Sequence, residues 1–349
     1  MTKGMRIMMG VLIVALFLLP VFAFAQPADK EVPLRYTDSS SSGWQSFLER
    51  GTVKNFLSIS QGYDNNVYLN SAREHDPFTQ ITYKTTFTSP LCDTMDAILG
   101  YEVMSLLYPQ EHDVDMIKNG VRIGLDTKLS DAVKLSTSYY FDYIDYPNTG
   151  SDDFLDHRMD FVVKQNLPYK MYHSLGYEFM YKDYQERQTR VERVVDFFGF
   201  PLNLGVINTG KNRSDIRNSI EYEIGKYFPK DLIKASYQYY YNDSNERYLN
   251  FYDHDSYRGS ISLTHIFTDK LFLYVSFSDQ YRFFRSRMLT TNEGSHERDR
   301  TYIASSALFY NLNESLSVGL NYSYRKNDSN EPIEKYTGSL VSLGAYYKF

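Results

Sequence analysis

Apolar and polar side chains alternate along most of the chain after residue 52. In residues 316–325, one face carries Leu316, Val318, Leu320, Tyr322 and Tyr324, and the other carries Ser317, Gly319, Asn321, Ser323 and Arg325. Residues 233–241 and 271–280 divide in the same way. Because successive side chains of a strand point to opposite faces, this pattern predicts strands with one apolar and one polar face.

Such segments recur about fourteen times, with twelve or sixteen strands as the alternatives. They begin near Val53, Phe78, Ala97, Met116, Val133, Asp156, Tyr172, Asp215, Leu232, Asp253, Leu271, Arg298, Leu316 and Tyr336. Short links (89–94, 129–131, 167–170, 228–231, 268–270, 311–314) alternate with long ones (61–76, 109–115, 147–155, 190–213, 243–252, 289–297, 327–335). Outer-membrane barrels combine short periplasmic turns with long extracellular loops. The sequence therefore predicts an all-β fold, a transmembrane antiparallel β-barrel over residues 53–349.

The chain ends on an aromatic residue that continues the last alternation. Val341, Leu343, Ala345, Tyr347 and Phe349 share one face of this segment. A terminal aromatic on such a strand resembles the assembly signal of bacterial outer-membrane barrels. We therefore expect Tyr347 and Phe349 to engage the barrel assembly machinery, and the apolar face to contact outer-membrane lipids. A soluble, secreted all-β protein is the alternative, because alternation alone does not prove lipid contact.

The N-terminal segment has the features of a secretory signal peptide. Lys3 and Arg6 precede an apolar run over residues 8–22, and Ala23-Phe24-Ala25 supplies small residues for cleavage. A membrane anchor is the alternative, but the run is short for a spanning helix. We predict a signal peptide over residues 1–25, cleavage near Ala25, and export to the outer membrane.

Residues 26–52 predict a periplasmic extension before the barrel. This region is polar, contains the tract 39–43 of four serines and a glycine, and carries Trp44, Phe47 and Leu48 at helical spacing. These three residues are interpreted as a local anchor beside the first strand. The alternative is a short helix that plugs the lumen or contacts a periplasmic or export-system partner.

Composition fits a barrel and excludes several other classes. The chain has 33 Tyr, 23 Phe and a mean hydropathy of -0.45, and no stretch after the signal approaches the about 18 apolar residues of a spanning helix. Abundant Tyr is typical of the aromatic girdles of membrane barrels. The net charge of -6 argues against general nucleic-acid binding. Cys92 is the single cysteine, which excludes an intramolecular disulfide.

The polar faces of the predicted strands supply the candidate lumen lining. Its charged members are Lys84, Glu102, Arg122, Lys134, Asp142, Asp160, Lys164, Glu178, Lys182, Arg217, Glu221, Glu223, Lys234, Arg282 and Arg325, accompanied by Tyr140, Tyr240 and Tyr274. Both signs are present, which predicts weak ion selectivity or charges paired across the lumen that narrow it. Luminal Tyr also leaves a saccharide path open, because aromatic rings stack on sugar faces.

Catalytic and metal sites have weaker support. Neither an H-E-x-x-H motif nor a closely spaced His pair occurs, and His254 with Asp255 is the cluster that a hydrolase would need. The acidic segments 64–66, 243–246 and 328–331 offer oxygen ligands for calcium, but Asn, Asp and Ser are also ordinary turn residues. We predict a protein that is not an enzyme, without a cofactor or resident metal.

Two further features of the sequence are a family resemblance and an internal repeat. The segment 61–70, with Tyr63-Asp64-Asn65-Asn66-Val67, resembles the opening of a family of outer-membrane β-barrel porins, some encoded with extracellular polysaccharide systems. A similar opening occurs in the barrel domain of surface lipoprotein assembly modifiers, and the final hairpins, residues 253–349, resemble those of both families. Only about 27 residues separate the cleavage site from the first strand, too few for the helical repeats of those proteins.

In addition, the sequence Asn-Asp-Ser-Asn-Glu occurs at both 242–246 and 327–331, through hairpin duplication or convergent turn chemistry.

These features predict a porin-like channel or export conduit for small polar solutes or saccharides. The alternative is a closed structural or assembly barrel that serves an envelope, surface-protein or polysaccharide export system. An outer-membrane hydrolase is the third hypothesis. The transported solute, the gating state and the oligomeric state stay open.

Overall fold

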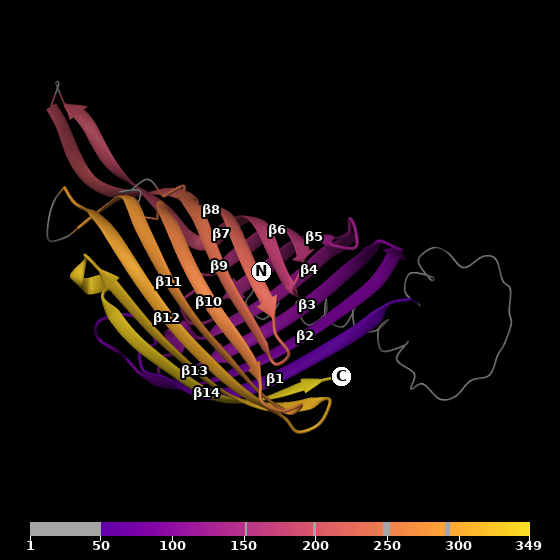
Figure 1. The fold of residues 1–349 in the computed structure, drawn as a ribbon. Helices are drawn as coiled ribbons and strands as arrows, with labels where there is room; N and C mark the ends of the chain where they lie inside the picture. The colour runs from indigo at the N-terminus through magenta and orange to yellow at the C-terminus, as the bar shows by residue number, and fades with distance from the viewer. Residues whose placement is uncertain (1–49, 151, 198–199, 247–251, 290–293) are drawn as a thin grey trace, which may run out of the picture. The chain divides into compact units, whose positions relative to one another are not determined.

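The computed structural model describes residues 50–349 except 151, 198–199, 247–251 and 290–293. These residues form fourteen strands in one closed antiparallel barrel, in which each strand pairs with its neighbours in sequence (Figure 1). The strands are β1 (Thr52–Asp64), β2 (Asp76–Cys92), β3 (Met95–Leu107), β4 (Met116–Lys128), β5 (Val133–Asp145), β6 (Phe154–Leu167), β7 (Met171–Phe197), β8 (Phe200–Tyr227), β9 (Asp231–Ser244), β10 (His254–Ile266), β11 (Leu271–Met288), β12 (His296–Asn311), β13 (Leu316–Ser329) and β14 (Tyr336–Lys348). Two single-turn 3₁₀ segments, η1 (His112–Val114) and η2 (Pro332–Glu334), lie in the connections.

The predicted fold class and the count of fourteen strands are confirmed. Within the described part of the chain, no helix has the length and apolar character needed to cross a bilayer. The predicted signal peptide, and the predicted extension up to residue 49, lie outside the described residues.

The barrel closes where the last strand meets the first. β14 pairs with β1 from Phe56 opposite Lys348 to Asp64 opposite Leu340. Phe349 continues this seam, because Asn55 N donates to its carbonyl at 2.8 Å and its own N–H donates to Asn55 O at 3.1 Å. The terminal residue therefore helps to close the sheet, and closure pairs the backbone groups that an open edge would expose in lipid.

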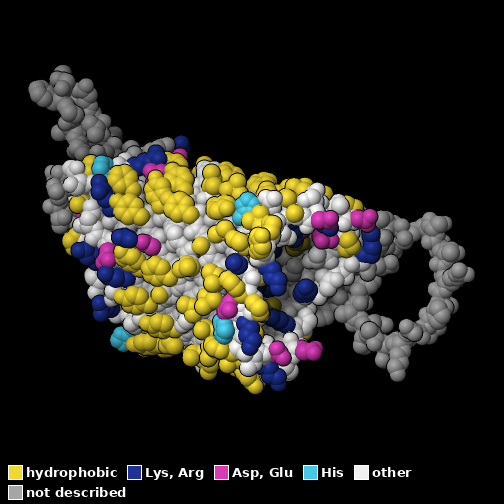
Figure 2. Space-filling model, viewed as in Figure 1, with side chains coloured by type: hydrophobic (Ala, Val, Ile, Leu, Met, Phe, Trp, Pro, Cys, Tyr) yellow, Lys and Arg dark blue, Asp and Glu magenta, His cyan; other side chains and the backbone are white. Residues whose placement is uncertain are grey.

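The outer face of the barrel is apolar and exposed. Leu343 is 64% exposed, Leu175 55% and Ile123 52%, and each lies on the outer face of its strand. Similar residues occur on the outer face of nearly every strand, and Figure 2 shows apolar side chains covering much of the wall in that view. So large an apolar surface is incompatible with a water-soluble monomer and fits a wall in contact with lipid. The barrel is therefore a transmembrane barrel.

The two ends of the barrel differ in their connections. The short links form one end, here named the turn end, and the long links form the other, named the loop end. At the loop end the outer face becomes charged: Arg300 pairs with Asp279 at 2.7 Å, and Arg285 pairs with Asp255 at 2.9 Å. Outward-facing ion pairs mark the level at which the hydrocarbon layer has ended.

One predicted loop is wrong. The sequence predicts a long link over residues 190–213, but β7 and β8 continue through most of this region as a paired hairpin. Figure 1 shows this hairpin extending beyond the neighbouring strands. Its pairing shifts register at three places between Asp183 and Val194, whereas residues 171–183 pair continuously with 214–226. Strand pairing satisfies backbone groups in water as well as in lipid.

Candidate functional site

The predicted lumen residues all lie on the inner face of the barrel. In β2 and β3, Lys84 and Glu102 occupy positions that alternate with the exposed Ile81 and Leu99. The same parity places Arg122, Lys134, Asp142, Asp160, Lys164, Glu178, Lys182, Arg217, Glu221, Glu223, Lys234, Arg282, Arg325 and the three candidate tyrosines opposite the outer apolar residues. Their role in transport stays a prediction.

Ion pairs on the inner face join strands that are neighbours or next neighbours. Lys84 Nζ lies 2.9 Å from Glu102 Oε2, between β2 and β3. Lys118 Nζ lies 3.2 Å from Asp142 and 3.8 Å from Glu102, so one ammonium serves both flanking strands. Across β8–β9, Lys234 lies 3.5 Å from Glu223. These pairs run along the wall between neighbouring strands.

Further pairs lie closer to the loop end. Arg282 Nη2 lies 3.2 Å from Asp299 Oδ2, and Arg325 Nη2 lies 2.8 Å from Asp64 Oδ2. Lys118 and Asp299, which complete two of these pairs, were missed among the candidates. Lys118 lies near the predicted loop 109–115, and Asp299 lies near the predicted start of a strand. The alternation of apolar and polar residues is short at such positions, so it did not assign either side chain clearly to the inner face.

Arginines also stack on inward tyrosines. Tyr140 on β5 lies between Arg122 of β4 and Arg158 of β6, with guanidinium carbons 5.4 and 4.1 Å from its ring centre. Arg217 lies 4.5 Å from the ring centre of Tyr240. Because these rings hold the guanidinium groups by cation–π contact, the arginines gain a second attachment to the wall.

Several of the inner charges remain accessible to water, although Asp142, Asp299 and Asp64 are buried. The Lys84 side chain is 47% exposed and that of Lys234 34%, although both belong to ion pairs. Those of Glu102 and Arg158 are 26% and 29% exposed. Charges in a filled barrel core would be almost fully buried, so this wall faces a hydrated interior.

The inner wall of β9–β13 differs from the charged wall of β2–β8. Ser236, Ser260 and Ser278 lie side by side on β9, β10 and β11. The next inner row consists of Ser262, Ser276, Ser305 and Ser323. Hydroxyls pair within these rows, at 2.8 Å for Ser236–Ser260 and 3.1 Å for Ser305–Ser323. Because serine side chains are short and carry hydroxyl groups, this half of the wall is polar and projects little into the lumen.

A cavity of about 270 Å³ opens in this hydroxyl wall. Its lining includes Glu221, Glu223, Lys234, Arg258, Tyr274 and the serines at 236, 260, 262, 276 and 278. The hollow forms because serines stand between longer side chains of β8, β10 and β11. It contains four charges that can act on a passing solute.

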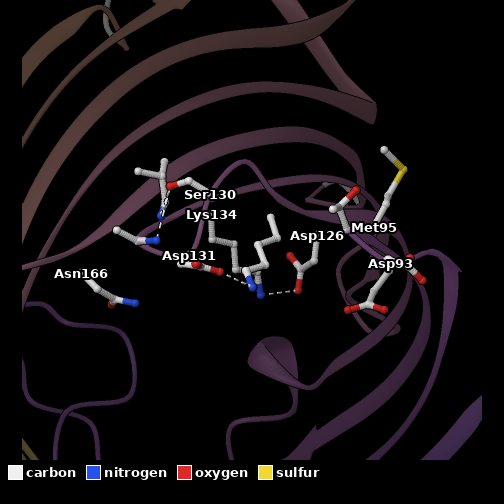
Figure 3. Close-up of a pocket in the computed structure, with 12 residues that line it drawn as sticks. Asp93, Met95, Asp126, Ser130, Asp131, Lys134 and Asn166 are labelled. Carbon is white, nitrogen blue, oxygen red and sulfur yellow. Dashed lines mark hydrogen bonds and ion pairs between the residues drawn. The ribbon is translucent and has the colours of Figure 1, made fainter.

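A second cavity, of about 310 Å³, lies at the turn end (Figure 3). It is lined by the β2–β3 and β4–β5 turns and by Asn166. Lys134 pairs with Asp126 at 2.7 Å, and Lys128 pairs with Asp131 at 2.8 Å. The hydrogen bond from Lys128 lowers the pKa of Asp131. These contacts stabilise adjoining turns and place no nucleophile beside a base.

Aromatic rings form an arc inside the turn end. Successive ring centres lie 5.0 Å apart for Phe272–Phe309, 5.4 Å for Phe309–Tyr346 and 6.2 Å for Tyr346–Phe56. A Cβ atom at Gly319 would lie only 2.7 Å from the Phe309 ring. Glycine at this position therefore allows the ring to lie flat on the neighbouring strand, as in other aromatic–glycine strand pairs.

In the part of the chain that the structure describes, three copies of a three-residue unit lie at the loop end, at 64–66, 244–246 and 329–331. The middle residue is Asn in each copy. Its N–H donates to a carbonyl of the adjacent strand at 3.0, 3.0 and 3.1 Å, and its Oδ1 accepts that same residue's N–H at 2.6, 2.8 and 2.7 Å. The first side chain accepts the N–H of the third residue, and the third residue is almost fully buried. We name this unit the Asn clasp.

The Asn clasp unites three sequence observations. The short motif that carries the family resemblance and both copies of the Asn-Asp-Ser-Asn-Glu repeat form this one structure, at the ends of β1, β9 and β13. The side-chain oxygens offered as calcium ligands in the clasps accept backbone N–H groups instead. Across the described residues, three or more potential ligand side chains do not gather as a metal site would need.

A buried carboxylate lies beside one clasp at the loop end. Glu297 is 1% exposed and pairs with Arg287 Nε at 2.8 Å, while Arg287 Nη2 also reaches Glu334 at 2.6 Å. Burial, and the nearby carboxylates Asp299, Glu334 and Glu331, raise the pKa of Glu297 to about 7. Glu297 lies beyond the outward-facing Arg298 and Arg300, and therefore outside the membrane-spanning part of β12.

The residues proposed for hydrolysis do not form a dyad. His254 faces inward, and its Nδ1 lies 2.8 Å from Tyr252 O. Asp255 faces outward, where it pairs with Arg285 and accepts a hydrogen bond from Tyr239 at 2.7 Å. Neighbouring residues of a strand point to opposite faces, so adjacency in sequence separates these two side chains.

Comparison with known proteins gives no match to a protein-family model or to a curated protein. Among solved structures, the trimer form of OmpT, an outer membrane protein of Vibrio cholerae, is 11% identical with a TM-score of 0.49, over 86% of this chain and 99% of that chain. The CymD monoaromatic hydrocarbon channel is 8% identical (TM-score 0.49, 85% and 88%). The anion-selective porin from Comamonas acidovorans is also 8% identical (TM-score 0.46, 86% and 99%). These likenesses concern the fold alone.

The predicted transmembrane β-barrel is confirmed by the closed barrel with its apolar outer face. The narrower resemblances, to a polysaccharide-associated porin family and to assembly modifiers, stay predictions.

Proposed function

We propose that the protein is a channel of the outer membrane for small polar solutes, saccharides included. One observation carries the proposal: charged and hydroxyl side chains line the inner wall, and several of the charges, such as Lys84 and Lys234, stay open to water. A barrel that served only as an anchor would gain stability by filling its interior with apolar side chains. In this orientation the turn end faces the periplasm and the loop end faces the exterior.

The wall charges support weak ion selectivity. Both signs occur, and most are paired with a neighbour on an adjacent strand. Opposite charges a few ångströms apart cancel for an ion that passes at a larger distance. A strongly selective pore would instead present a ring of one sign.

The Asn clasps support a constantly open outer mouth. Each clasp fixes the chain after its strand to the neighbouring strand by two backbone-directed hydrogen bonds. The ends of β1, β9 and β13 are thereby held in the barrel wall, so the proposal is a passive pore rather than a gated one.

The test is conductance of the mature chain in planar bilayers. We expect ohmic steps at all moderate voltages and, in liposome-swelling assays, entry rates that fall with solute size. Ser262→Trp should lower both, because it fills the hydroxyl wall. Leu263→Trp is the matched control on the lipid face of the same strand.

Two results would overturn the proposal. Correctly folded barrels that insert without conducting would exclude an open channel and favour the closed barrel. Equal effects of the two Trp substitutions would show that solutes do not pass along this wall.

A further inference from the structure

The cavity in the hydroxyl wall contains two charges that the rest of the wall leaves unsatisfied. Among the described residues, Glu221 on β8 and Arg258 on β10 form neither an ion pair nor a side-chain hydrogen bond. The other two charges of the cavity are engaged, since Glu223 is held by Lys234 at 3.5 Å and by Tyr172 Oη at 2.7 Å. The cavity therefore offers one free anion and one free cation.

The strand register fixes the separation of these two groups. Glu221 and Arg258 both lie opposite Gln238 of β9, one on each side. Their backbones are therefore two strand spacings apart, about 10 Å. Gln238 does not bridge them, because its amide donates to Ser219 Oγ at 2.9 Å.

The floor between the two charges consists of small hydroxyl side chains. Ser236 and Ser260 lie in the next row and hydrogen-bond to each other at 2.8 Å, and Ser278 continues that row. Hydroxyls both donate and accept, so they suit the amide groups of a ligand that lies across them. The volume of about 270 Å³ is near the lower limit of about 300 Å³ for small-molecule sites, which favours a small ligand.

We propose that this cavity binds a small zwitterion, an amino acid or short peptide. This deepens the proposed channel function and rests on it by naming the solute class. Arg258 binds the ligand carboxylate, for which its planar guanidinium is suited, Glu221 binds the ammonium group, and the serines contact the atoms between them. A neutral sugar or a simple ion would leave one or both charges without a partner, so opposite charges on one molecule fit best.

Binding is tested by titration calorimetry of the full mature protein in detergent with the peptide Gly-Gly-Gly. We expect binding by the wild type and at least tenfold weaker binding by Glu221→Gln and by Arg258→Gln. Arg300→Gln, which alters an outward charge at the loop end, is the control and should bind as the wild type does. Heat-modifiable gel migration verifies that each variant is folded.

A charge swap separates the loss of charge complementarity from a structural disturbance of the cavity. The double variant Glu221→Arg/Arg258→Glu should regain binding that either swapped single variant loses, because a zwitterion can bind in the reverse direction. N-acetylated Gly-Gly-Gly amide, which lacks both charges, should bind at least tenfold more weakly. Equal binding of the blocked peptide or of sucrose, or unchanged binding by both Gln variants, would overturn the proposal.

Calorimetry and conductance fail separately. If the barrel conducts but does not bind the tripeptide, the channel proposal stands and the zwitterion site is refuted. If it binds the tripeptide but does not conduct, the zwitterion site stands and the channel proposal is refuted.

Discussion

Removing one member of a wall ion pair should give the pore a measurable ion preference. Lys84 neutralises Glu102 at 2.9 Å, and the side chains are 47% and 26% exposed. In Lys84→Met, Glu102 keeps only Lys118, which lies 3.8 Å away and is already shared with Asp142 at 3.2 Å. The wall then carries one additional negative charge, so we expect a shift towards cations.

The size of the shift follows from the barrel dimensions. Fourteen strands spaced about 4.8 Å apart and tilted by about 40° give a backbone radius of about 14 Å. A side chain that reaches about 6 Å inward leaves about 8 Å to an ion on the axis, where one charge in water contributes about 0.5 kcal/mol. The effect is opposite for K⁺ and Cl⁻, so their permeability ratio should change about fivefold without screening, and about two- to threefold at ~0.05 M salt.

The measurement is the reversal potential of single channels across a KCl gradient. Lys84→Met/Glu102→Gln should restore the wild-type value, since it removes both charges of the pair. Arg300→Met, on the outer face, should have no effect. An unchanged reversal potential in Lys84→Met, or a double variant that does not revert, would refute the assignment of this pair to the permeation path.

Three further results are expected. Asn330→Ala should lower the free energy of unfolding by about 1–2 kcal/mol in urea titrations, because it removes hydrogen bonds to Arg298 N and His296 O, whereas Asn330→Asp, which keeps the acceptor, should lose less. The raised pKa of Glu297 means that the folded state retains a proton that the unfolded state has released, so wild-type thermal stability should fall as pH rises from about 4.5 to about 7, and Glu297→Gln should remove this dependence. Replacing residues 189–210 by a two-residue turn should preserve the heat-modifiable gel shift and leave conductance unchanged, since residues 171–183 and 214–226 keep their continuous pairing.

The strands could be predicted because their signal is local. Side chains that face lipid alternate with side chains that face water, and every strand that crosses the membrane repeats this pattern. The same reasoning failed at residues 190–213, where the hairpin has left the membrane and one face no longer has to be apolar. Pairing continues there because backbone hydrogen bonding requires no lipid, and a polar sequence such as Asn212-Arg213-Ser214 gives no warning.

The residues of the inner face could be predicted from the sequence, but the contacts between their side chains could not. Parity along one strand assigns Arg122 and Tyr140 to the lumen, whereas their contact with Arg158 depends on the register between three strands. The Asn clasps show the same limit. Two of the three copies were visible as a repeat, but the first has Asn where the others have Glu, and only its contact with Ser339 reveals the shared geometry.

The arrangement of the wall determines where selectivity can arise. Paired charges such as Lys84 with Glu102 cancel at the distance of a passing solute, so they keep the wall hydrated without choosing among solutes. Glu221 and Arg258 lack such partners among the described residues and lie across a low, hydroxyl-lined hollow, so their field is not cancelled locally. A solute with one charge is attracted by one group and repelled by the other, whereas a zwitterion gains from both when it turns to match them. Preference for a zwitterion over a singly charged solute at this cavity should therefore depend on Glu221 and Arg258.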